Sequence, residues 1–296
     1  MLLLAMLTAC TQQNRQEAAA ENASVISQAE VTPPEEMQAS GEIQAPEAAS
    51  AEAPATQPEE LSNMLQSFTS DTQQAGGEWA AAVQRADEGR CIASNSRPMQ
   101  SASLIKLFVA ATVEENMDMV TAGEQYSGET ADLLFSMLSQ SDNEAANTLV
   151  RRLGGGDAAA GMALVNQYCA ANGYEDTSMG RLMLDFQAQA DNFTSVEDCC
   201  AFLQSLLTGG VQGADEILDA LKQQVRTGKI PAGIPDGVVT ANKTGELETV
   251  ENDAAIVWAG DCPYILCVMS QNLADAGAAR NHIVNISQQI YRYFSN

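Results

Sequence analysis

Residues 103–113 read SLIKLFVAATV, and this nearly unbroken apolar run predicts a buried helix. Ser103 stands at the start of the run, where free backbone N–H groups and the positive end of the helix dipole gather. Lys106 lies one turn further on and on the same face. A lysine there could take the proton of the serine hydroxyl, provided that its own pKa is lowered. Taken alone, the pair also fits a helix cap followed by a lysine whose stem is buried.

The segments on either side of this run predict a mixed fold. Strands are expected at 79–86, 91–94, 238–243, 254–259 and 264–269. Helices are expected from residue 61, at 130–138, 144–153, 158–171, 195–207 and 214–224, and at the C-terminal end. A long connection is expected at 172–193. This order predicts an α+β domain: an antiparallel sheet flanked by helices, with an inserted all-helical subdomain.

The N-terminal part of the 296-residue chain differs in composition from the rest. Residues 11–60 contain no aromatic side chain and carry ten acidic residues against one base, Arg15. Such a segment cannot bury enough apolar surface to fold, so we expect a disordered acidic tether there and a folded domain at 61–296.

Residues 1–10 are apolar and end Leu7-Thr8-Ala9-Cys10. This resembles the lipobox of bacterial lipoproteins, which implies lipidation of Cys10 and a location outside the cytoplasm, anchored to the bacterial cell membrane. The stretch is too short to span a bilayer and has no basic residues before it. Either the true start lies upstream or the resemblance is accidental.

Charge and composition narrow the class of function. The net charge of −25 argues against a nucleic-acid partner. His282 is the one histidine, so a zinc site built on several histidines is excluded and a Ser-His-Asp triad would have to use it. Its neighbours Ile283, Ile286 and Ile290 have helical spacing, which favours a structural role. We expect no metal, no cofactor and a monomer.

Six further cysteines remain beyond Cys10. They are Cys91, Cys169, Cys199, Cys200, Cys262 and Cys267. Six thiols allow fifteen pairings, and none of them follows from sequence. Free buried thiols and disulfides both stay open, and the spacing is not that of a C-x-x-C metal site.

Two later motifs change the interpretation of Ser103 and Lys106. Ser141-Asp142-Asn143 falls in a break between two predicted helices, and Lys243-Thr244-Gly245 ends a predicted strand. Alone, the first is an ordinary capping loop and the second an edge lysine before a turn. In this order, S-x-x-K, S-D-N and K-T-G are the motifs of serine β-lactamases and penicillin-binding proteins. The folded part, 61–296, resembles that superfamily. Residues 141–147, SDNEAAN, are similar to its class A branch, whereas a class C enzyme would place Tyr at position 141.

The resemblance implies catalysis through an acyl-enzyme. Ser103 would attack the carbonyl of a β-lactam or of a D-Ala-D-Ala-like peptide, and Lys106 would take its proton. Ser141 would relay a proton to the leaving nitrogen. The backbone N–H groups of Ser103 and Glu246 would form the oxyanion hole.

The same resemblance implies how the substrate is held. Asn143 would hydrogen-bond the substrate amide, while Lys243 and Thr244 would bind its carboxylate. Gly245 would let the substrate lie against the strand. The charge of Lys243 would also help to keep Lys106 neutral.

One position departs from the family pattern. Class A enzymes carry a glutamate, two residues after an arginine in the Ω-loop, that activates the deacylating water. If Arg181 matches that arginine, Met183 takes the place of the glutamate, and a methionine cannot accept a proton. The possible substitutes nearby are Glu175, Asp176 and Asp185.

The sequence therefore predicts a class A β-lactamase-like serine hydrolase that acts on β-lactams through Ser103. A D,D-peptidase of the penicillin-binding type, with slow deacylation, is the first alternative. A cell-surface lipoprotein that keeps the fold and only binds its ligand is the second.

Overall fold

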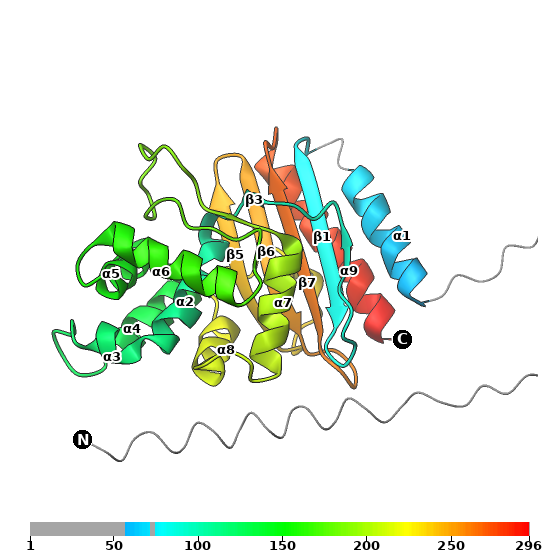
Figure 1. The fold of residues 1–296 in the computed structure, drawn as a ribbon. Coiled ribbons are helices and arrows are strands. Elements are labelled where there is room, and N and C mark those ends of the chain that lie inside the picture. The colour runs from blue at the N-terminus through cyan, green and yellow to red at the C-terminus, as the bar shows by residue number, and fades with distance from the viewer. Residues whose placement is uncertain (1–56, 72–74, 296) are drawn as a thin grey trace, which may run out of the picture. The chain divides into compact units, whose positions relative to one another are not determined.

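The computed structural model describes residues 57–71 and 75–295, and its centre is a five-stranded antiparallel sheet (Figure 1). The strands follow the order β2-β1-β7-β6-β5, so β5 forms an outer edge. Their bounds are β1 (Glu78–Arg85), β2 (Ile92–Ser94), β5 (Thr240–Leu247), β6 (Val250–Val257) and β7 (Tyr264–Gln271). This arrangement confirms the predicted α+β fold with an antiparallel sheet flanked by helices.

Helices cover both faces of the sheet. In Figure 1, α1 (Gln57–Ser70) and α9 (Ala276–Ser295) lie on one side, and the other helices lie on the opposite side. The second group consists of α2 (Ile105–Glu115), α3 (Met117–Thr121), α4 (Glu129–Phe135), α5 (Asn143–Leu153), α6 (Ala158–Ala171), α7 (Val196–Leu207) and α8 (Ala214–Lys222). The shorter elements are β3 (Met99–Gln100), η3 (Ala102–Leu104), η4 (Ser136–Gln140), β4 (Phe193–Thr194) and η5 (Pro231–Gly233).

Alternate residues of the strands enter two separate cores. On β1, Ala80 and Ala82 belong to the core shared with the larger helical group. Trp79, Ala81 and Val83 face the core that includes α1 and α9. The period of two follows from the pleat of a strand. Because both faces are covered, the strand appears in the sequence as a continuous apolar run.

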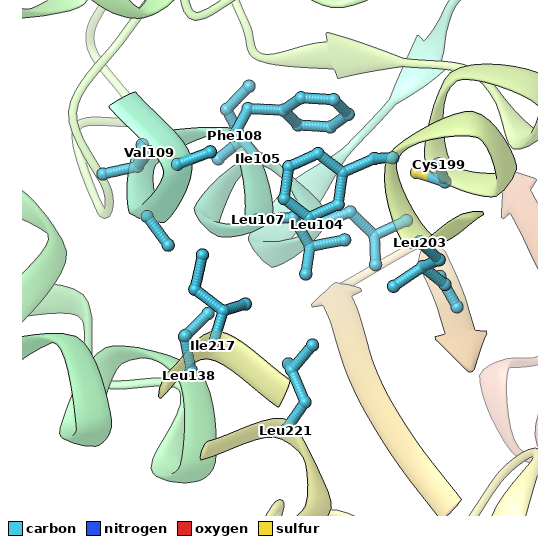
Figure 2. Close-up of a cluster of buried hydrophobic side chains, with 14 of the residues drawn as sticks. Leu104, Ile105, Leu107, Phe108, Val109, Leu138, Cys199, Leu203, Ile217 and Leu221 are labelled. Carbon is cyan, nitrogen blue, oxygen red and sulfur yellow. The ribbon is translucent and has the colours of Figure 1, made fainter. Parts of the chain in front are cut away.

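The helix α2 is buried throughout, as the run at 103–113 predicted. All residues from 105 to 114 are buried. Figure 2 shows side chains of this helix, among them Leu107 and Phe108, in one buried cluster with Leu203 of α7 and Leu221 of α8. A helix that is apolar on every side belongs to the core. Each such side chain contributes about 1.5–3 kcal/mol on burial, so Lys106 projects from a firmly held support.

Two helix boundaries differ from the predicted ones. α1 begins at Gln57, so residues 57–60 of the predicted tether form its first turn, where Glu59 and Glu60 complement the helix dipole. The predicted helix at 130–138 is divided, because α4 ends at Phe135 and a π-helical turn, η4, continues to Gln140.

Strand β5 also differs from the predicted strand at 238–243, because it extends to Leu247. The Lys243-Thr244-Gly245 motif lies inside β5 and not at its end. Strand β6 continues to pair beyond it, with Lys243 opposite Ala254 and Gly245 opposite Asn252. The backbone hydrogen bonds of β6 thus extend the strand past the motif, which the side-chain pattern alone did not indicate.

The remaining expectations concern the N-terminal segment, the membrane and the cysteines. Cys10, and residues 11–56 of the predicted tether, lie outside the described residues. Within 57–71 and 75–295, no helix has the length and apolar character needed to cross a membrane. The six described cysteines all carry free thiols.

Candidate active site

Ser103 is presented by a strained turn, η3, two residues before α2 begins. Ala102 has a φ of 47°, a left-handed conformation that costs a residue with a Cβ about 1–2 kcal/mol. Strand β5 supports this turn at close range, because a Cβ on Gly245 would lie 2.6 Å from the Ser101 carbonyl oxygen and 3.3 Å from the Ser103 nitrogen. The space that we expected to be left for substrate beside Gly245 is therefore filled by the protein's own backbone.

Ser141 lies in a tight turn between η4 and α5. Its φ is 62°, and its backbone N–H donates to the Ser136 carbonyl, which closes η4. Asp142 then caps α5, because its carboxylate accepts from the backbone N–H groups of Glu144 and Ala145. These two caps hold the nearly buried Ser141 hydroxyl in a defined place.

Lys106 makes three hydrogen bonds in the interior. Its Nζ donates to the Ser141 carbonyl at 2.7 Å, to Asn143 Oδ1 at 2.7 Å and to Ser141 Oγ at 3.3 Å. Burial lowers the pKa of Lys106 to about 7, with Asp142 opposing the shift and Arg226 adding to it. An amine with this pKa is partly neutral at neutral pH and can accept a proton.

Lys243 approaches the same hydroxyl from β5. Its Nζ donates to Ser141 Oγ at 2.8 Å and to the Thr244 carbonyl at 2.8 Å. Burial, followed by the positive charge of Lys106, lowers the pKa of Lys243 well below its usual range. Burial is thus the main cause of the shift in both lysines, whereas the sequence suggested mutual repulsion.

A cavity of about 610 Å³ opens beside this group of residues. Ser103, Asn143 and Glu246 line it, and Lys106, Ser141 and Lys243 are linked by hydrogen bonds behind its wall. Ser103 is half-buried and lines the cavity, and its hydroxyl makes no hydrogen bond to the described residues. The predicted residues are therefore brought together, with Thr244 and Gly245 buried on β5.

Met183 also lines the cavity and is almost completely buried. Asn147 of α5 holds its backbone from both sides, since Oδ1 accepts from the Met183 N–H at 2.7 Å and Nδ2 donates to the Met183 carbonyl at 3.1 Å. The backbone of Met183 is consequently fixed at the position where the resemblance implies a glutamate. Its thioether offers no group that could deprotonate water.

The loop that follows Met183 is fastened by Arg181. The Arg181 Nε donates to Asp191 Oδ1 at 2.6 Å, and its guanidinium lies 5.3 Å from the ring centre of Phe186. Of the three acids proposed as replacement bases, Asp185 lines the cavity. Glu175 and Asp176 are not among its described lining residues.

Sequence reasoning missed two supporting features of this site. The role of Asn147 had a signal, since it lies four residues after Asn143 and therefore on the same face of α5. The strain at Ala102 had none, because an alanine in a left-handed turn leaves no trace in composition. Within the described residues, no group of three or more His, Cys, Asp or Glu side chains could hold a metal ion.

A scan against protein-family models matches this chain to a known family. The model described as the β-lactamase enzyme family matches residues 117–294, which is more than half of the chain. A search of curated proteins finds no match.

Solved structures with the same fold include three that are 20–22% identical to this chain. A β-lactamase from Sphaerobacter thermophilus is 22% identical with a TM-score of 0.66, over 78% of this chain and 96% of the other. A β-lactamase from Xanthomonas campestris is 20% identical with a TM-score of 0.68, over 79% and 98%. PBP-A is 22% identical with a TM-score of 0.67, over 79% and 96%. At this identity the likeness establishes the fold.

Proposed function

Because the chain belongs to the β-lactamase enzyme family, we propose that it is a serine hydrolase that opens β-lactams through an acyl-enzyme on Ser103. The observation that carries the proposal is the chain of hydrogen bonds from Lys106 through Ser141 to Lys243, since Lys106 also donates to Asn143, which lines the same cavity as Ser103. A fold alone would not require two buried lysines to meet on one hydroxyl. Burying a lysine is costly unless its amine is neutral or well partnered.

The proposed acylation begins at Lys106. Its neutral amine takes the proton of the Ser103 hydroxyl while the serine oxygen attacks the lactam carbonyl carbon. The N–H groups of Ser103 and Glu246 stabilise the negative charge on the carbonyl oxygen. When the carbon–nitrogen bond of the ring breaks, Ser141 gives its proton to the nitrogen and recovers one from the lysines that donate to it. The product is an ester on Ser103 with the ring opened.

Release of that ester requires a second proton acceptor to activate water. Met183 stands on the wall where the resemblance implies this base, and it cannot fill the role. A positioned general base contributes roughly 10²–10⁴ in rate. We therefore propose that acylation is efficient and that deacylation is slow, unless Asp185 reaches the water.

The test is a time course of intact mass after the protein is mixed with benzylpenicillin. The expected result is the mass of one added penicillin, which lasts for hours and is absent in Ser103→Ala. A variant of PBP-A has been solved as an acyl-enzyme complex with penicillin G, which supports the choice of ligand. Labelling that persists in Ser103→Ala would refute the site, and an adduct lost within seconds would refute slow deacylation.

A D,D-peptidase acting on peptidoglycan stem peptides is the second candidate, and Met183 is the observation that favours it. Such an enzyme reacts with β-lactams and then releases them slowly. Release of D-alanine from a D-Ala-D-Ala peptide, measured with the same preparation, separates the two candidates. Turnover of the peptide together with a long-lived penicillin adduct would favour the peptidase.

We also propose that the chain is a lipoprotein outside the cytoplasm. The support is the Leu7-Thr8-Ala9-Cys10 stretch followed by a long acidic segment. Expression of the full chain in bacteria fed with labelled palmitate should give labelled protein, and Cys10→Ser should remove the label. Equal labelling of both proteins would refute the anchor.

A further inference from the structure

Glu246 lies beside the place where a substrate carboxylate is expected. It is two residues after Thr244 on β5, so the two side chains leave the same face of the strand about 7 Å apart. Glu246 also lines the cavity with Ser103 and Asn143. Under the proposed function, Lys243 and Thr244 would receive the carboxylate of the substrate. The protein therefore presents a carboxylate of its own at the edge of that subsite.

The cations near this subsite are already paired within the protein. Arg226 Nη1 lies 2.9 Å from Glu246 Oε2, and Lys229 Nζ lies 3.2 Å from Glu246 Oε1. Lys229 also contacts Glu251 Oε2 at 2.7 Å, and Arg280 contacts the second oxygen of Glu251 at 2.7 Å. A substrate carboxylate would have to compete with these contacts to gain a positive partner.

The remaining charges do not favour an incoming anion either. Lys243 is completely buried, and its Nζ already donates to Ser141 Oγ and to the Thr244 carbonyl. The negative charge of Asp253, which is buried on β6, interacts favourably with Lys243 and Lys229 and so offsets their attraction for an incoming anion. Glu248 and Asp185 line the cavity, and neither has an ion pair among the described residues.

We infer that Glu246 is a specificity-determining residue that fills the carboxylate subsite from within, so that the site acylates substrates with a neutral group there in preference to carboxylates. The inference rests on the proposed function. A carboxylate next to Thr244 must approach Glu246 to about 7 Å and take Arg226 from it, whereas an ester or an amide faces neither cost. The substrate class is thus a β-lactam or peptide whose carboxylate is esterified or amidated.

The experiment compares benzylpenicillin with its methyl ester, which differ only in this charge. The second-order rate constant of acylation is measured for both, and the ratio of acid to ester is followed across variants. Glu246→Gln should raise this ratio about tenfold, the size expected for one charge at about 7 Å in a partly hydrated site. Arg226→Gln should lower it, because Glu246 then lacks its partner. The control Glu88→Gln lies on the exposed turn between β1 and β2, is not among the described lining residues of the cavity, and should change the ratio less than twofold.

A ratio in Glu246→Gln that stays within twofold of the wild-type value, or falls, would overturn the inference. A measurement that needs no chemistry separates this failure from failure of the proposed function. In the Ser103→Ala background, the ratio of dissociation constants for acid and ester should shift in favour of the acid by about tenfold when Glu246→Gln is added. If the wild-type protein is not acylated by either compound, the proposed function fails, and this binding ratio still decides the role of Glu246.

Discussion

Two parts of the cavity lining differ in the groups that they offer for proton transfer. We call the part with Ser103 and Asn143 the equipped wall, and the part with Met183 the unequipped wall. The equipped wall carries Ser103 and Asn143, and Asn143 bonds to the first of two lysines that have lowered pKa values and share the Ser141 hydroxyl. In the unequipped wall, Asn147 fixes the backbone of Met183 by two hydrogen bonds, but the Met183 side chain is a thioether and cannot accept a proton. Under the proposed mechanism, the cavity has the groups that form the ester on Ser103, and it has a methionine at the position where the resemblance implies the base that breaks it. How firmly a residue of the cavity is held and whether it can accept a proton are separate properties, and each can be tested alone.

The largest effect should come from removing the base on the equipped wall. Lys106→Met keeps the length of the side chain and removes the amine, so the acylation rate should fall about 10³-fold. The measurement is the second-order rate constant with benzylpenicillin. Lys222→Met is the control, since Lys222 is a surface lysine paired with Asp219 and should leave the rate unchanged. A loss below tenfold in Lys106→Met would mean that another group accepts the proton.

The next largest effect should come from equipping the other wall. Met183→Glu places a carboxylate where the backbone is already held by Asn147, so deacylation should accelerate about 10²-fold. The measurement is the lifetime of the adduct by intact mass. Met183→Gln is the matched control, because it has the same size and shape without a proton acceptor. Equal lifetimes in the two variants would show that the missing base is not what limits release.

The pH dependence of acylation gives a smaller effect on the same wall. Only the neutral amine of Lys106 can accept a proton, and burial lowers its pKa to about 7. As the pH falls below this value, the neutral fraction and the rate should fall about tenfold per pH unit, and above it they should level off. Rates with benzylpenicillin between pH 5.5 and 8.5 check this, with circular dichroism as the control for folding. A rate that stays flat down to pH 5.5 would contradict the assigned role.

The equipped wall could be predicted from sequence because its residues lie in short motifs. Ser103 and Lys106 share one turn, and the residues at 141–143 cap a helix, so local spacing carries the information. The structure places these residues together with Lys243. The strands and the buried helix α2 also follow from local apolar patterns, which explains why the fold class was predicted correctly.

The features that escaped prediction depend on contacts between distant segments. The turn at Ser103 is 3₁₀ and strained, and β5 packs against it where Gly245 approaches Ser101. The paired charges around Glu246 come from β5, β6, α9 and the segment before η5. No local spacing relates such residues, so sequence patterns cannot indicate which charges neutralise one another.

The smallest kinetic effect should come from loosening the unequipped wall without changing its chemistry. Asn147→Ala removes both hydrogen bonds to Met183 and leaves buried backbone groups unpaired, so the free energy of unfolding should fall by about 2–4 kcal/mol. Asn166→Ala is a closely matched control, because Asn166 holds the backbone of Met179 in the same way, at 2.6 and 3.1 Å.

Urea unfolding of the two variants, together with the lifetime of the penicillin adduct, makes this comparison. Both should lose stability, but only Asn147→Ala should change the lifetime, by a few-fold, because Met183 lines the cavity and Met179 does not appear among its described lining residues. If both variants changed the lifetime equally, general loss of stability would be the cause. The order of the wall around Met183 would then have no part in how long the ester survives.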